Sequence, residues 1–278
     1  MKANIVSFSG GRTSAYLVHC IEQMRKDGRL QGPVEYIFMD TGAEHPKTYE
    51  FIKKCVAHFG IELTCLRADV SSEMGVGVKP KVIPIDEIGP DLKPWKDFLA
   101  KYGSPHVHGA FCTRRMKSEP ADKYVKAKYG KGNYMQWLGI RIDEPRRLKD
   151  GADFILGWWS EMPFDLEIEE WLGNCVFCIK KGLNKVALAA KDEPGLAIQF
   201  IDVTEGDGVR REGLKYSSGL MYRGHNSLSS IIDTYKDVPR EEIINSLRRS
   251  KRFDSGSCSE SCEAFACQLD LFSEDDAA

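Results

Sequence analysis

Residues 4–14 read Asn4-Ile5-Val6-Ser7-Phe8-Ser9-Gly10-Gly11-Arg12-Thr13-Ser14. The first five residues predict a short buried strand, and apolar residues then recur at helical spacing from residue 13 to about residue 26. The two glycines allow successive backbone N–H groups to curl inward at a helix N-terminus, where the helix dipole attracts negative charge. Three hydroxyl groups add donors. The stretch therefore predicts an anion cradle suited to phosphate, with a spacing that differs from the Walker P-loop.

The pattern continues outward from this stretch as alternating strands and helices. Residues 34–39 and 61–66 predict two further strands, and residues 47–59 predict the helix between them. This order implies a parallel sheet with right-handed crossovers, and hence an α/β fold. Residues 134–140 predict a fourth strand and residues 154–158 a fifth.

Three parts follow from the distribution of residue types. Residues 1–160 form the α/β domain, in which the proline-rich stretch 70–133 predicts an insertion of loops and short helices. Residues 161–252 form a mainly helical part, with helices expected at 166–172, 183–191, 228–235 and 240–249. Residues 253–278 are rich in Ser, Cys and acidic residues, and we expect them to be disordered unless a metal or a partner orders them.

Composition excludes several classes of protein. The chain has 278 residues, 42% of them hydrophobic and 29% charged, which is ordinary for a globular protein and excludes collagen and coiled coil. No apolar run approaches the roughly 20 residues that span a bilayer. Without a signal-peptide pattern at the N-terminus, we expect a cytoplasmic protein. Nine cysteines in that compartment indicate metal or redox chemistry rather than disulfides.

The net charge of −2 is unevenly distributed. Seven of the 41 acidic residues and none of the 39 Lys and Arg residues lie in 253–278, which leaves the body with a charge of +5. The body could attract an anionic ligand, or the tail could simply aid solubility.

A second motif follows the second strand: Asp40-Thr41-Gly42-Ala43-Glu44-His45-Pro46. It lies at the carboxyl edge of the predicted sheet, where ligands bind. Asp40 could hold a metal ion or a ribose, or it could cap the following helix.

Cysteines form a third motif. Cys175-Val176-Phe177-Cys178 is a C-x-x-C followed by three lysines, and Cys112 lies 63 residues earlier. Thiolates at this spacing hold zinc or iron–sulfur clusters, and nearby cations stabilise thiolate charge. The alternative is a pair of half-buried structural cysteines.

A fourth motif follows the fourth strand: Gly139-Ile140-Arg141-Ile142-Asp143-Glu144-Pro145-Arg146-Arg147. Three arginines at the sheet edge suit a polyphosphate or a sulfate. Alone, such a stretch could equally be a solvated loop.

These motifs together resemble the phosphoadenosine phosphosulfate (PAPS) reductase-like branch of the PP-loop, or adenine nucleotide α-hydrolase-like, superfamily. Four pieces match in order over about residues 4–185: the glycine stretch 7–14, Asp40-Thr41-Gly42, the block Cys112-Thr113-Arg114-Arg115-Met116-Lys117-Ser118-Glu119-Pro120, and the motif at 139–146. The resemblance implies a flavodoxin-like parallel sheet that binds ATP or PAPS, with Mg²⁺. It also implies a [4Fe–4S] cluster.

The resemblance assigns roles residue by residue. The implied nucleotide-binding residues are Ser7, Ser9, Gly10, Gly11, Arg12, Thr13, Ser14, Asp40, Thr41, Gly42, Gly139 and Arg141. The implied catalytic residues are Asp40, Arg141 and Arg146. The implied cluster ligands are Cys112, Cys175 and Cys178, with either an open iron or a tail cysteine, taken here as Cys262, in the fourth place.

The chain also departs from the family pattern. Thr13 stands where many members carry Asp, and Phe111-Cys112 stands where iron–sulfur reductases usually show two cysteines. The tail lacks the Glu-Cys-Gly context of the reductive cysteine. We therefore expect ATP-dependent activation of DNA or tRNA and sulfur transfer to it. The alternatives are a sulfonucleotide reductase and a non-catalytic nucleotide or metal sensor tethered to the sliding clamp.

The tail carries one more motif, Gln268-Leu269-Asp270-Leu271-Phe272. It resembles the pentapeptide by which bacterial replication and repair proteins bind the sliding clamp. Leu271 and Phe272 would be the apolar anchors that fill a pocket on the partner. The alternative is an amphipathic end that packs on the body of the protein.

Overall fold

The computed structural model of the chain describes residues 1–139, 158–212 and 219–249. A five-stranded sheet with the order β4-β3-β2-β1-β5 lies at its centre. The strands are β1 (Ala3–Ser7), β2 (Val34–Met39), β3 (Leu63–Asp69), β4 (Lys79–Ile83) and β5 (Tyr134–Leu138). All neighbouring pairs are parallel except β3 and β4. The predicted α/β class and the four strands predicted before residue 141 are therefore confirmed.

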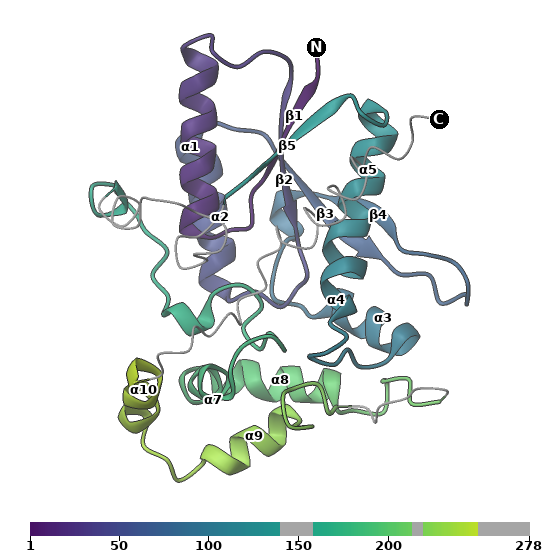
Figure 1. Cartoon of the computed structure of the whole chain (residues 1–278), viewed down its shortest axis with the longest axis vertical. Coiled ribbons are helices and arrows are strands. Elements are labelled where there is room, and N and C mark those ends of the chain that lie inside the picture. The colour runs from purple at the N-terminus through teal and green to yellow at the C-terminus, as the bar shows by residue number, and fades with distance from the viewer. Residues whose placement is uncertain (140–157, 213–218, 250–278) are drawn as a thin grey trace, which may run out of the picture.

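Helices cover both faces of the sheet (Figure 1). Helices α1 (Arg12–Lys26) and α2 (Pro46–Phe59) lie on one face, and α5 (Glu119–Tyr129) lies on the other. Val6 packs in the cluster under α1 and α2, whereas its neighbour Ile5 packs with Val125 of α5. Successive side chains of a strand point to opposite faces, so a strand buried on both faces is a continuous apolar run. Burial on both faces explains why β1 contains the consecutive apolar residues Ile5 and Val6 instead of an alternation of polar and apolar residues.

The strand order creates a switch point between β1 and β5. The chain proceeds from β1 to β2 and β3 on one side, whereas β5 pairs with β1 on the other side. A crevice forms outside the carboxyl ends of two such strands, and open α/β sheets bind their ligands there. The glycine turn follows β1 and Gly139 follows β5, so both lie at this switch point.

The stretch 70–133 contains more regular structure than the sequence predicts. It includes the edge strand β4, a 3₁₀ turn η1 (Ile85–Glu87), α3 (Lys93–Tyr102), and α4 (Phe111–Thr113), which continues through a π turn η2 (Arg114–Ser118) into α5. The prolines that suggest loops are tolerated because β4 is an edge strand and because Pro94 and Pro120 lie in first helical turns.

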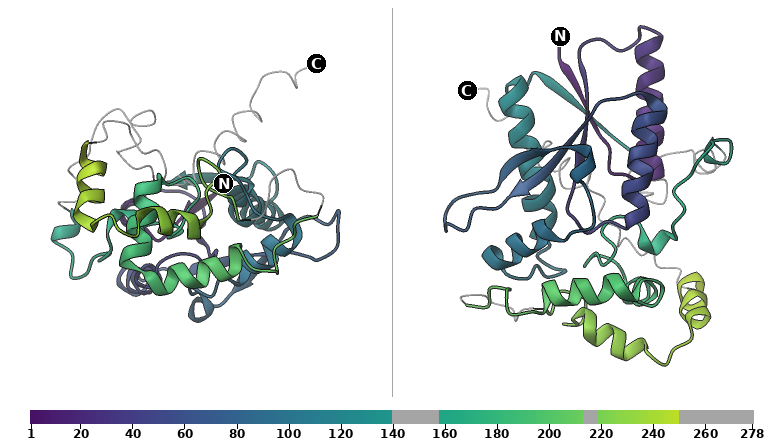
Figure 2. Two further views of the ribbon diagram at one scale, coloured as in Figure 1. Left: turned by 90° about the horizontal axis from the view of Figure 1, so that it is seen from below. Right: turned by 180° about the vertical axis from the view of Figure 1, so that it is seen from behind.

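A layer of helices lies across the carboxyl edge of the sheet (Figure 2). Its elements are η3 (Glu170–Leu172), α7 (Leu183–Asp192), α8 (Pro194–Thr204), α9 (Leu228–Tyr235) and α10 (Arg240–Arg249). The helices predicted at 183–191, 228–235 and 240–249 are confirmed, and so is the helical C-terminal part. Helix α8 was not predicted, since its Pro-Gly start suggests a turn.

Two further predictions differ from the structure or lie partly outside it. The helix predicted at 166–172 is wrong except for the short η3, because the chain from 166 to 169 is irregular, with Ile168 N bonded to Leu166 O, and packs Leu166 into the core. The strand predicted at 154–158 lies outside the described residues except for Trp158, which is helical. Within the described ranges, no helix has the length and apolar character needed to cross a bilayer.

Candidate functional site

The glycine turn has a backbone that only glycine adopts readily. Gly10 has φ +79°, and a Cβ atom there would lie 2.9 Å from both Ile52 Cδ1 and Thr48 Cγ2 of α2. Gly11 is the N-cap of α1, and no side-chain hydrogen bond caps this helix among the described residues. The first amides of a helix have no partner within the helix. The turn therefore presents backbone donors at the switch point between β1 and β5.

Two serines and a second close approach shape the cradle. Ser14 Oγ accepts hydrogen bonds from Ser9 N and Ser9 Oγ, both at 3.1 Å, and donates to Gly11 O at 3.0 Å. A Cβ on Gly139 would lie 3.0 Å from Ser14 Cα, so the end of β5 touches the first turn of α1. Ser7, Ser9 and Thr13 are half-buried around this contact. The predicted nucleotide-binding residues of β1, the turn and Gly139 are thus gathered in one place.

Arg12 belongs to the turn but its side chain is bound elsewhere. Its guanidinium donates to both carboxylate oxygens of Asp165, at 2.6 and 2.8 Å, and to Leu166 O at 2.5 Å. The backbone carbonyl of Arg12 accepts from Trp159 Nε1 at 3.1 Å. The predicted cradle thus has its arginine fixed to the segment 158–168.

Asp40 lies at the end of β2 and is fully buried. Its carboxylate accepts hydrogen bonds from Arg67 Nε at 2.8 Å, Tyr49 OH at 2.9 Å and Gly42 N at 2.9 Å. Burial and the neighbouring Glu44 raise the pKa of Asp40 to about 6, although Arg67 opposes the shift. This carboxylate, predicted to be catalytic, organises the end of β2 through contacts inside the protein.

Glu44 is the centre of a buried polar group to which the sequence motifs assign no role. Its carboxylate accepts from Thr41 Oγ1 at 2.9 Å and Tyr49 OH at 3.0 Å, pairs with Lys117 Nζ at 3.5 Å, and lies 3.8 Å from Cys175 Sγ. Glu44 is 2% exposed and Lys117 6%. The group joins β2, the π turn and the C-x-x-C segment, because Val176 N also donates to Ala43 O at 2.9 Å.

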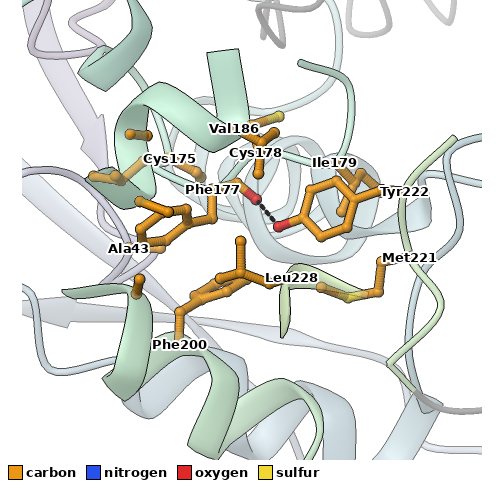
Figure 3. Packing of buried hydrophobic residues seen from close by; sticks show 14 of the residues in the cluster. Ala43, Cys175, Phe177, Cys178, Ile179, Val186, Phe200, Met221, Tyr222 and Leu228 are labelled. Carbon is orange, nitrogen blue, oxygen red and sulfur yellow. Dashed lines mark hydrogen bonds between the residues drawn. The ribbon is translucent and has the colours of Figure 1, made fainter. Parts of the chain in front are cut away.

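The C-x-x-C segment forms a compact turn inside an apolar cluster (Figure 3). Cys178 N donates to Cys175 O, and Tyr222 OH donates to Phe177 O at 2.9 Å. Behind it, the Nζ of the buried Lys181 donates to Trp171 O and Val176 O, and burial lowers the pKa of this lysine to about 8. Sequence spacing places the lysine near the turn but does not reveal that it is buried.

The three described candidate ligands lie in one region without forming a ligand set. Cys175 and Cys178 belong to the apolar cluster, and Cys112 packs against it. Among the residues that the structure describes, no three His, Cys, Asp or Glu side chains are placed to hold a metal ion. The donor types suit iron–sulfur or zinc, but their present arrangement does not fit a preformed site.

Several predicted site residues lie outside the described ranges. They are Arg141, Arg146, Cys262 and the tail motif Gln268, Leu269, Asp270, Leu271 and Phe272. The structure therefore gathers the glycine turn, the end of β2 and three cysteines near one edge of the sheet. The signal that could have found Glu44 and Lys117 is their presence inside two motifs already singled out.

Comparisons with known proteins agree with this architecture. The model of the phosphoadenosine phosphosulfate reductase domain matches residues 3–151. The nin region protein ORF290 of Escherichia phage lambda is 47% identical over 286 residues, covering 96% of this chain and 97% of the phage protein. A phosphoadenosine 5′-phosphosulfate reductase of Alteromonas mediterranea is 36% identical over 69 residues, covering 25% of each chain. The chain belongs to the phosphoadenosine phosphosulfate reductase domain family, a family of adenine-nucleotide enzymes.

Proposed function

We propose that this protein binds an adenine nucleotide in the glycine turn and cleaves ATP between the α- and β-phosphates, in order to activate a nucleic acid for sulfur transfer. The observation that carries the proposal is the start of α1 at the β1/β5 switch point, which no side chain of the described residues caps and against which Gly139 packs at Ser14. Backbone amides at such a position bind phosphate without a cationic side chain. Membership of the family supports adenine as the base.

The proposed reaction has two balanced steps. An oxygen of the nucleic acid attacks the α-phosphorus, the bond from the α-phosphorus to the bridging oxygen breaks, and pyrophosphate leaves. Hydrosulfide then attacks the activated carbon or phosphorus, the bond from that atom to the AMP-bearing oxygen breaks, and AMP leaves. The amides of residues 10–13 stabilise the negative charge that develops on the departing pyrophosphate. Mg²⁺ would enter with the nucleotide, and Arg141 and Arg146 are proposed to contact the phosphates.

The first experiment measures pyrophosphate release from Mg·ATP with DNA or tRNA as acceptor. The matched control is Gly10→Ala, which places a Cβ against α2 and distorts the cradle. We expect acceptor-dependent release that the variant loses. No release with any nucleic acid would count against the activation step.

A [4Fe–4S] cluster remains part of the proposal because thiolates are its usual ligands. Cys112, Cys175 and Cys178 would hold it, with a fourth place left open or taken by Cys262. Since the described side chains do not form a ligand set, no step is derived through the cluster. Iron, acid-labile sulfide and zinc per chain, measured on anaerobically purified protein beside Cys175→Ser, test this part.

Reduction of a sulfonucleotide is the second candidate activity. It is favoured by the short match to the Alteromonas reductase. Sulfite released from labelled PAPS in the presence of thioredoxin would support it, whereas pyrophosphate release without sulfite would support the first activity. Tight nucleotide binding without either product would support the non-catalytic sensor.

We also propose that the tail motif at residues 268–272 binds the bacterial sliding clamp. The support is the sequence alone: two apolar anchors in an acidic segment. Surface plasmon resonance of the full chain on immobilised clamp, compared with Phe272→Ala, tests the interaction. Equal binding by the two proteins would contradict it.

A further inference from the structure

The segment 158–168, called here the strap, crosses the start of α1 and reaches α2. Trp159 and Leu166 are buried in the cluster beneath these helices, at 2% and 6% exposure. The ring of Trp159 lies 5.2 Å from that of Phe51, and Lys47 Nζ donates to Glu167 O at 3.2 Å. The strap is therefore packed on both helices that border the cradle.

Arg12 is the point at which the strap meets the glycine turn. Its guanidinium makes a two-pronged contact with Asp165 and a third contact with Leu166 O, and its carbonyl accepts from Trp159. Exposed ion pairs contribute little to stability, and this pair is about one-third exposed. However, a bidentate contact uses the planar fork of arginine, so it fixes the orientation of the guanidinium in addition to pairing its charge.

We propose that Arg12 is the anchor of the strap and not a phosphate ligand, and that Asp165 is a positioning residue for nucleotide binding. The strap holds both the guanidinium and the backbone carbonyl of Arg12. These contacts fix the first turn of α1, whose amides lie at the switch point. Within the glycine turn, phosphate is then bound by neutral donors, which are backbone N–H groups and hydroxyls. This inference rests on the proposed nucleotide site and specifies which of its residues contact the ligand.

The test is a double-mutant cycle with Arg12→Gln, Asp165→Ala and the double variant. ATP dissociation constants are measured, together with hydrogen–deuterium exchange of peptides covering the strap. If Arg12 acts through Asp165, each single variant and the double variant weaken ATP binding by the same factor, roughly tenfold, because the two residues form one unit. All three variants should also speed exchange in the strap. Arg25→Gln, which removes a partner of Glu22 on the same helix, should change neither quantity.

Arg12→Lys separates charge from geometry. Lysine keeps the positive charge but lacks the fork, so an anchor fails whereas a phosphate-binding point charge survives. We expect Arg12→Lys to behave like Arg12→Gln.

Three results would overturn the proposal: ATP binding that Arg12→Gln weakens and Asp165→Ala leaves intact, additive losses in the double variant, or faster strap exchange on adding ATP to the wild type. If the wild type binds no adenine nucleotide, the proposed function fails. The exchange measurement then tests only the anchoring of the strap by Arg12. Unchanged strap exchange in Arg12→Gln and Asp165→Ala would reject that anchoring.

Discussion

The ends of β1 and β2 lie side by side at one edge of the sheet, yet they use polar groups in opposite ways. After β1, the glycine turn presents neutral donors, and the one cation in it is directed to the strap. After β2, two carboxylates are buried with Arg67 and Lys117 as their partners. Polar groups already satisfied inside the protein stabilise it, whereas donors left at a crevice are available to a ligand. This difference supports the proposal that the residues after β1 bind the ligand and that the buried carboxylates after β2 stabilise the edge of the sheet.

Removing Glu44 should cause the largest loss of stability. Glu44→Ala takes the carboxylate away from the buried Lys117 ammonium, and breaking a buried pair in this way costs about 3–5 kcal/mol. Urea unfolding measures the free energy of unfolding. Asp97→Ala, which removes the partner of the exposed Lys93, is the control and should cost no more than about 1 kcal/mol. Equal losses of unfolding free energy in Glu44→Ala and Asp97→Ala would show that the buried pair of Glu44 and Lys117 does not stabilise the fold.

Gly10→Ala should weaken ATP binding as well as destabilise the fold. The positive φ and the contacts with Ile52 and Thr48 strain the turn, and strain of this kind costs about 1–3 kcal/mol. ATP affinity should fall at least roughly tenfold because the donors move away from the positions that suit phosphate. Gly28→Ala, also at positive φ but with open space around it, is the matched control and should keep its ATP affinity.

Asp40 should give a pH dependence of stability with an unusual sign. Its folded pKa of about 6 lies above the ordinary value of 3.8, so the folded state binds the proton more tightly. The contribution of Asp40 to stability is therefore full below about pH 4 and is lost as the pH rises through about 6. The difference in unfolding free energy between the wild type and Asp40→Asn should decrease across this interval.

Asp192 provides a control of opposite sign. Burial alone would raise the pKa of Asp192, yet hydrogen bonds from Arg240 and Trp171 lower it. Its stabilising contribution should therefore be present above the ordinary pKa and lost as the pH falls. If Asp40→Asn and Asp192→Asn changed the pH profile in the same direction, the description of the group after β2 would be wrong.

Much of the fold was predictable because its signals are local. The apolar runs of β1 and β2 and the helical spacing of α1 and α2 have the lengths and periods that these elements require. The edge strand β4 was missed because prolines mask it, and α8 was missed because a Pro-Gly pair begins it. A proline is tolerated both in an edge strand and in the first turn of a helix, so neither element is prevented by it.

The sequence predicted where the motifs of the candidate site lie on the sheet, but it did not predict which side chains bind one another there. The motifs at residues 9–14 and 40–42 lie at the same edge of the sheet, as their places after strands imply. The C-x-x-C segment follows η3 and reaches this edge through the bond from Val176 N to Ala43 O, which its sequence does not imply. Sequence could not show that Arg12 binds Asp165, 153 residues away, or that Lys117 reaches Glu44, because such pairs depend on the tertiary fold. Charge alone makes Arg12 look like a phosphate ligand, and only geometry shows its side chain engaged elsewhere.

The central claim is that an adenine nucleotide binds to the neutral donors after β1 and leaves the charged group after β2 undisturbed. Hydrogen–deuterium exchange with and without saturating Mg·ATP tests it most directly, by comparing peptides that cover residues 8–15 with peptides that cover residues 40–49. We expect ATP to slow exchange in 8–15 and to leave 40–49 unchanged. Unchanged exchange in 8–15, or protection confined to 40–49, would contradict the account.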